Sequence, residues 1–216
     1  MDIEFFKHST KPIKMRTILA LTFIALLSNP SYSQSDKTKG TLNEISGEYA
    51  VDDNGNVTYV KIIEIPETTK EVLYTRAVDY FTYRYNDGES VIQVKDKESG
   101  HIVAKGLYQK VFSYKGYVGY DIDTWHILTV DVKEGRARVI LSLTEYRVVT
   151  KFADGDRWNS TELVSENYPI NPKGLKKNVF GGGFASSHEK ALDTFAQLEK
   201  TLREGTTFKG ADKKDW

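Results

Sequence analysis

Alternation of apolar and polar residues predicts three antiparallel hairpins along this chain. The first occupies residues 47–65, where Asn54 and Gly55 supply a tight turn between segments rich in Val, Ile and Tyr. The second occupies residues 91–106, around a polar stretch that ends at Gly100. The third occupies residues 125–146, around a polar turn at 133–136.

The second hairpin has one register that separates its apolar from its polar side chains. With Val94 opposite Ala104 and Ile92 opposite Gly106, one face carries Ile92, Val94, Ile102 and Ala104. A slip of one residue would mix the two sets, because side chains in a strand alternate between faces. The segment therefore predicts a hairpin with an apolar inner face.

The third hairpin predicts both a core face and an opposite face. With Lys133 opposite Arg136, the core face pairs Val132, Val130, Leu128 and His126 with Ala137, Val139, Leu141 and Leu143. His126 is then expected to be a buried, neutral imidazole. The opposite face carries Trp125, Ile127, Thr129 and Asp131 on one strand, and Arg138, Ile140, Ser142, Thr144 and Tyr146 on the other.

Two segments have the spacing of amphipathic helices, and each follows a capping box, in which a hydroxyl and a carboxylate satisfy free backbone N–H groups. The boxes begin at Thr68 and Ser186. The first helix is expected to bury Leu73, Ala77, Tyr80 and Phe81 and to end at Asn86, Asp87 and Gly88. The second is expected to bury Ala191, Leu192, Phe195, Leu198 and Leu202 and to end near Gly205.

The resulting order is strand, helix, four strands and helix, written β-α-β4-α. It predicts an α+β domain over residues 47–205, in which an antiparallel sheet carries two helices on one face. Residues 34–46 are expected to be a flexible tether and 206–216 a frayed tail. Residues 113–123 are expected to form a tyrosine-rich loop, and 151–185 a long loop that wraps the domain or acts as a flap.

The N-terminus predicts export. A basic segment is followed by an apolar run at 18–27 and by Ser31 and Ser33 at the −3 and −1 positions of a cleavage site, so residues 1–33 have the form of a signal peptide. The apolar run is too short for a typical membrane span, although a membrane anchor is the alternative. Translation could start at Met15. We expect a periplasmic or extracellular protein with no transmembrane segment in its mature chain.

Composition and motifs exclude several classes of function. Equal numbers of basic and acidic residues, 30 each, argue against a nucleic-acid-binding protein. No Cys is present, and His188-Glu189 lacks the second His of a zinc motif, so neither a metal nor another cofactor is expected. No catalytic motif occurs. An envelope hydrolase that brings together Asp96, His101 and Glu145 remains the alternative function.

Residues 49–81 and 90–106 resemble the secreted Bacteroidota-type family called domain of unknown function 4468. The shared features are the Asn-Gly hairpin, the helix start at residues 68–74 and the hairpin that follows it. The resemblance extends over residues 47–203. It departs from the family where this chain has Tyr80 or Phe81 near the position of the family's usual Trp. The resemblance implies a TATA-binding-protein-like fold of β-α-β4-α order. It implies no activity, substrate or catalytic residue.

We therefore expect a non-catalytic binding module of the cell envelope, whose partner is a protein, a glycan or a lipid. Large apolar side chains on a rigid sheet are typical contact residues. The predicted binding residues are those of the face opposite the core, together with the tyrosines of the loop: Trp125, Ile127, Ile140, Tyr146, Tyr114, Tyr117 and Tyr120. The alternative for this face is that the 151–185 segment covers it.

Overall fold

A computed structural model describes residues 36–85, 91–171 and 177–206. Its elements are α2 (Asp36–Glu44), the 3-10 helix η1 (Ile45–Gly47), β1 (Ala50–Val51), β2 (Val57–Glu64), α3 (Lys70–Arg84), β3 (Ile92–Asp96), β4 (His101–Tyr114), β5 (Gly119–Lys133), β6 (Arg136–Lys151), β7 (Arg157–Leu163), the 3-10 helix η2 (Val164–Glu166) and α5 (Lys177–Glu204). The predicted signal peptide, the helix end at 86–88 and the tail from 207 lie outside the described residues.

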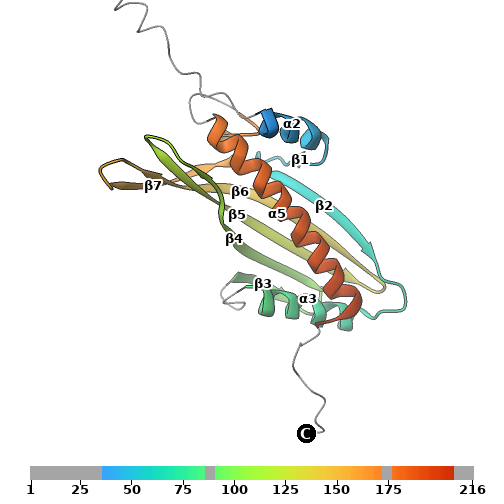
Figure 1. Cartoon of the computed structure of the whole chain (residues 1–216). Coiled ribbons are helices and arrows are strands. Elements are labelled where there is room, and N and C mark those ends of the chain that lie inside the picture. Colours follow the sequence, from blue (N-terminus) through green and yellow to red (C-terminus); the bar gives the residue numbers. More distant parts are fainter. Residues whose placement is uncertain (1–35, 86–90, 172–176, 207–216) are drawn as a thin grey trace, which may run out of the picture. The chain divides into compact units, whose positions relative to one another are not determined.

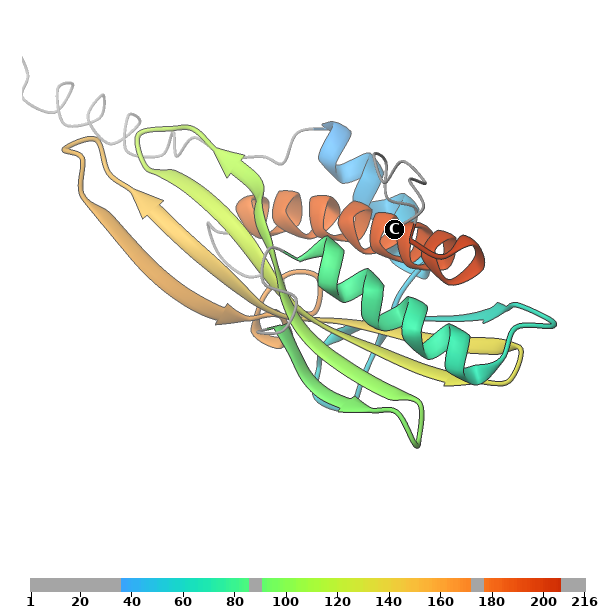
Figure 2. The ribbon, with the colours of Figure 1, turned by 90° about the horizontal axis from the view of Figure 1, so that it is seen from below.

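One antiparallel sheet of seven strands forms the framework. Its order is β1-β2-β6-β5-β4-β3. Strand β7 also pairs with β6, on the edge that β2 occupies but farther along β6. The long helices α3 and α5 lie together on one face of this sheet (Figures 1 and 2). The predicted α+β class, with an antiparallel sheet and two helices on one face, is confirmed. We call the opposite face, which carries Trp125, Ile127 and Ile140, the outer face.

The β5–β6 hairpin has the predicted register over most of its length. Lys133 pairs with Arg136, and the pairing continues to His126 and Leu143. A β-bulge then intervenes, so that Trp125 pairs with Glu145 and not with Thr144. Beyond the bulge the side chains of β6 exchange faces, because one extra residue reverses the alternation.

Helix α3 buries the predicted side chains but begins one residue later than expected. The cap is Thr69, whose hydroxyl accepts a hydrogen bond from the Val72 amide at 3.3 Å. Leu73, Ala77, Tyr80 and Phe81 are all buried, as predicted. Tyr74 joins them, so the buried stripe is wider than the pattern alone indicated.

Helix α5 begins at Lys177, nine residues before the predicted capping box at Ser186. Its first turns contain a glycine triplet, at two positions of which the helix lies very close to the sheet. A Cβ atom added to Gly182 would lie 2.4 Å from the Phe112 ring, and one added to Gly183 would lie 2.9 Å from Ile122. The glycines are therefore a packing surface and not a flexible lead-in.

The β3–β4 hairpin differs from the predicted register. Ile92 pairs with Ala104 and Val94 with Val103, with a bulge between them. The turn closes early because the Asp96 carboxylate accepts hydrogen bonds from the backbone amides that follow it. Val94 consequently lies on the outer face, 43% exposed, and not on the core face.

Three expected loops contain regular structure. Residues 36–44, within the expected flexible tether, form α2, which with η1 buries Leu42 and Ile45. Most of residues 113–123 belongs to β4 and β5, which leaves only a short turn. The 151–185 segment contains β7, η2 and the start of α5. Periodicity missed these elements because they are short, edge-located or rich in glycine.

Candidate functional site

A mainly apolar row, with Thr129 as its polar member, crosses five strands on the outer face. Val94, Val103, Thr129, Ile140 and Val60 are successive cross-strand partners on β3, β4, β5, β6 and β2. Val60 is 61% exposed. Its neighbour on the same face, Ile62, is 60% exposed. A solvated sheet face normally carries polar residues at these positions, so this row indicates a contact surface.

Trp125 and Ile127 extend this apolar surface along β5. Both are half-buried, and the two side chains share the outer face with Ile140 as predicted. The Lys105 ammonium lies 5.0 Å from the Trp125 ring centroid, which is within the range of a cation–π contact. Lys105 also approaches the Glu145 carboxylate at 3.7 Å. The indole is thus held in place while part of it stays accessible.

Ion pairs border the apolar surface at its β5–β6 turn end. Asp131 accepts hydrogen bonds from His101 Nδ1 at 2.6 Å and from Arg138 Nη2 at 2.7 Å. Burial opposes ionisation of Asp131, but these hydrogen bonds outweigh it, and the pKa of the carboxyl is lowered. At the other end Asp123 forms an ion pair with Arg147. The outer face therefore has an apolar centre and a charged rim, the usual arrangement of a protein interface.

The structure separates the other four predicted binding residues from this surface. Tyr146 is fully buried in the core, because the bulge near Trp125 moves it to the helix side, and its hydroxyl donates to the Tyr168 carbonyl at 2.8 Å. Tyr114 and Tyr120 form a cross-strand pair that packs against the core. Tyr117 is 85% exposed at the turn between β4 and β5.

Sequence reasoning missed three exposed members of the outer face: Val60, Ile62 and Val94. The alternation in β2 contained a usable signal, since Val60 and Ile62 fall on the opposite phase from Tyr59 and Ile63. Val94 could not be found in this way, because its position depends on a bulge that the pattern does not mark.

The residues of the alternative hydrolase do not form one site. Asp96 pairs with His101 across the β3–β4 turn. Its carboxylate, however, accepts hydrogen bonds within that turn, and these bonds, chiefly from Ser99, lower the pKa of Asp96. Glu145 lies opposite Trp125, whereas His101 lies opposite Asp131. Trp125 and Asp131 are six residues apart on β5, so Glu145 and His101 are roughly 20 Å apart along the sheet. This geometry does not support acid–base catalysis by the three residues together.

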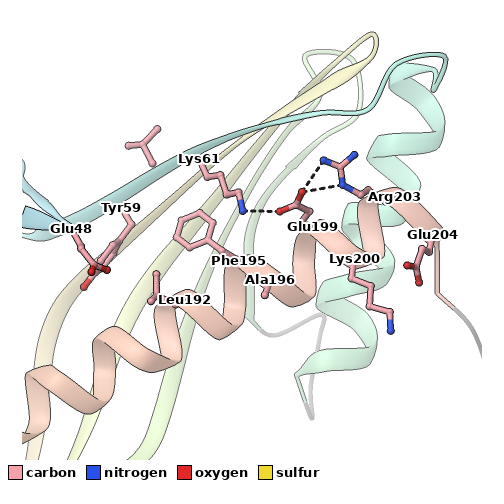
Figure 3. A pocket seen from close by; sticks show the side chains of 11 residues that line it. Glu48, Tyr59, Lys61, Leu192, Phe195, Ala196, Glu199, Lys200, Arg203 and Glu204 are labelled. Carbon is pink, nitrogen blue, oxygen red and sulfur yellow. Dashed lines mark hydrogen bonds and ion pairs between the residues drawn. The ribbon is translucent and has the colours of Figure 1, made fainter. Parts of the chain in front are cut away.

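A groove of about 540 Å³ runs between β2 and α5 on the helix side (Figure 3). Leu192, predicted to be buried, is 46% exposed and lines this groove. Glu199 accepts from Lys61 at 2.7 Å and from Arg203 at 2.8 Å, and the Lys61 hydrogen bond is the largest cause that lowers its pKa. Over the whole lining, three acidic residues balance three basic ones, so the groove presents no net charge to a ligand: Glu48, Glu199 and Glu204 against Lys61, Lys200 and Arg203.

No group of three or more His, Asp or Glu side chains in ranges 36–85, 91–171 and 177–206 is placed to hold a metal ion. Over the same ranges, each helix is either too short or too polar to pass through a bilayer.

Comparison with known proteins gives a family match over part of the chain and a similar fold. Residues 59–147 match the family model described as a domain of unknown function, DUF4468, with TBP-like fold. A TBP-like protein from Parabacteroides distasonis is 14% identical, with a TM-score of 0.51, over 73% of this chain and 98% of that chain. A DUF4468 family protein from Bacteroides ovatus is 15% identical, with a TM-score of 0.46, over 71% and 91%. No curated protein matches the chain.

Proposed function

We propose that this chain, whose residues 59–147 match the DUF4468 family model with TBP-like fold, is an exported, non-catalytic module that binds a protein through the outer face. The proposal is supported above all by one observation. The row of Val94, Val103, Thr129, Ile140 and Val60 places four apolar side chains and one threonine on five adjacent strands, and Val94 and Val60 are exposed. Export is inferred from residues 1–33.

The chemistry of the outer face favours a protein over a lipid or a glycan. An anionic membrane attracts unpaired Lys and Arg side chains, whereas Arg138, Arg147 and Lys105 each lie beside a carboxylate. Small ligands usually bind in concave sites, whereas the apolar row crosses a broad sheet surface, which is more typical of a protein contact. A partner with an apolar patch of its own would bury the row and keep the charged rim partly hydrated.

The test compares capture of envelope proteins by substituted forms of the full chain, purified from its native host. Ile140→Lys places a charge at the centre of the outer face and should reduce recovery of the bound partner by about ten-fold or more. Val72→Lys is the matched control, because Val72 is 40% exposed on α3, on the helix side. Quantitative mass spectrometry of co-purified proteins measures the recovery.

The expected result is that one set of proteins is retained by the native chain and by Val72→Lys and is lost with Ile140→Lys. Melting temperatures of the three forms establish that each is folded. Equal recovery with Ile140→Lys and the native chain would overturn the outer face as the binding surface.

A further inference from the structure

A second hollow, of about 480 Å³, lies on the helix side between α3, β4 and α5. We call it the tyrosine pocket, because Tyr80, Tyr85 and Tyr108 contribute to its wall. Val91 and Leu107 add apolar surface. Its remaining side chains are polar: Arg84, Gln109, Lys190, Asp193, Thr194 and Gln197. Its volume is within the usual range for small-molecule sites.

The wall of the tyrosine pocket is built around one buried imidazole. His126 is fully buried, its Nε2 lies 3.0 Å from the Tyr85 hydroxyl, and its ring stacks on Tyr108 with centroids 4.0 Å apart. Gly106 makes this arrangement possible. A Cβ atom at that position would lie 2.6 Å from His126 Nε2 and 2.7 Å from the Tyr85 ring.

The hydrogen bonds of this wall leave phenolic groups available to a ligand. Thr194 donates to the Lys190 carbonyl, so in its contact with Tyr108 at 2.6 Å it is the acceptor, and the Tyr108 oxygen keeps its lone pairs. The Tyr85 oxygen has one bond to His126. In either tautomer of the imidazole, the Tyr85 hydroxyl therefore keeps one hydrogen-bonding function unused, and Tyr85 is part of the pocket wall.

The mouth of the tyrosine pocket has an excess of positive charge. Arg84 and Asp193 face each other at 3.9 Å, and Asp193 also accepts from Gln197 at 2.6 Å. Lys190, by contrast, forms no ion pair with any side chain in the described ranges. Two cations against one carboxylate favour an anionic group in the ligand.

From these groups we propose that the tyrosine pocket binds a small polyhydroxylated carboxylate, of the uronic-acid type. Lys190 and Arg84 would take its carboxylate. Tyr85 and Tyr108 would bond its hydroxyl groups, and Val91 and Leu107 would contact its carbon skeleton. The pocket does not involve the outer face, so this proposal does not depend on the proposed protein partner.

The test titrates the full chain with glucuronate, with glucose and with acetate, and follows backbone amide signals by NMR. Glucuronate should produce saturable shifts at signals of the pocket residues. Glucose lacks the carboxylate and acetate lacks the hydroxyl groups, so each should bind at least about ten-fold more weakly. Tyr85→Phe and Lys190→Gln should each weaken glucuronate binding by about ten-fold.

Tyr83→Phe is the matched control, because Tyr83 is on the same helix and its ring is 57% exposed. It should leave glucuronate affinity unchanged. Lys190 is exposed, so Lys190→Gln keeps the test decisive if Tyr85→Phe fails to fold. No saturable shift with glucuronate, equal binding of acetate, or unchanged affinity in Lys190→Gln would each overturn the proposal.

Discussion

His126 is a histidine that folding keeps uncharged. Its side chain is fully buried, and the Tyr85 hydroxyl at 3.0 Å is a neutral partner. Burial disfavours the imidazolium and lowers the pKa of His126 to about 3. Strand alternation predicted this position correctly, because His126 has the same phase as Leu128 and Val130 in β5. Tyr85 could not be foreseen as its partner, since 41 residues separate the two in the chain.

Stability of the native chain should fall in mild acid because of His126. Its pKa is lower in the folded state than its usual value near 6.5, so the unfolded chain binds the extra proton as the pH drops below that value. The stabilisation is fully present above about pH 6.5 and is lost progressively toward pH 3. Between pH 7.5 and 5.5 the loss should be about 1.4 kcal/mol in the free energy of unfolding.

The measurement is urea denaturation at both pH values for the native chain and for His126→Leu. The substitution removes the titrating group, so the variant should lack this part of the pH dependence, although it loses the Tyr85 hydrogen bond and about 1–3 kcal/mol at neutral pH. His101 and His188 are present in both proteins and cancel in the comparison. An identical pH dependence in the two proteins would contradict a neutral, buried His126.

At the scale of elements, the β5–β6 hairpin and α3 could be predicted because their side chains alternate regularly and are buried on one side. The errors arose where one residue breaks the alternation. The bulge beside Trp125 moves Tyr146 from the outer face into the core, and the bulge between Ile92 and Val94 moves Val94 outward. A bulge carries no obligatory residue type, so hydrophobic periodicity does not reveal it.

The first turns of α5 were missed for a different reason. Three consecutive glycines normally disfavour a helix, at a cost of about 1 kcal/mol each relative to Ala. Here Gly182 and Gly183 allow the helix to approach Phe112 and Ile122 more closely than any side chain would permit. Packing against the sheet therefore outweighs local propensity, and only the tertiary structure contains that information.

Hydrogen exchange should show that this segment is a stable part of the helix. The backbone amide of Phe184 lies in α5, and its side chain is fully buried. Its exchange rate should therefore be within about ten-fold of that of Leu198, farther along the same helix. Exchange of Phe184 at the rate of an unstructured peptide would contradict a continuous helix from Lys177.

At the scale of the whole molecule, the sheet has two different faces. The helix side buries the core under α3 and α5, while the outer face keeps apolar side chains accessible inside a charged rim. The sequence predicted Trp125, Ile127 and Ile140 on this surface. Their neighbours on β2 and β3 became evident only when the strand order brought them together.

Export predicts a defined mature chain. Cleavage after Ser33 would leave Gln34 as the first residue, because Ser31 and Ser33 have the small side chains that the cleavage site requires. Intact-mass measurement on protein recovered from outside the cytoplasm of its native host checks this. A recovered mass that still includes residues 18–27 would contradict cleavage.

Site-specific photo-crosslinking in the native host tests the proposed binding surface most directly. A photoreactive residue replaces Val60, which is 61% exposed on the outer face, and in a second form it replaces Val72 on α3. If the outer face binds a protein, position 60 should give a discrete covalent adduct with one partner protein and position 72 should give none. Adducts from position 72 alone, or no adduct from position 60, would contradict protein binding through the outer face.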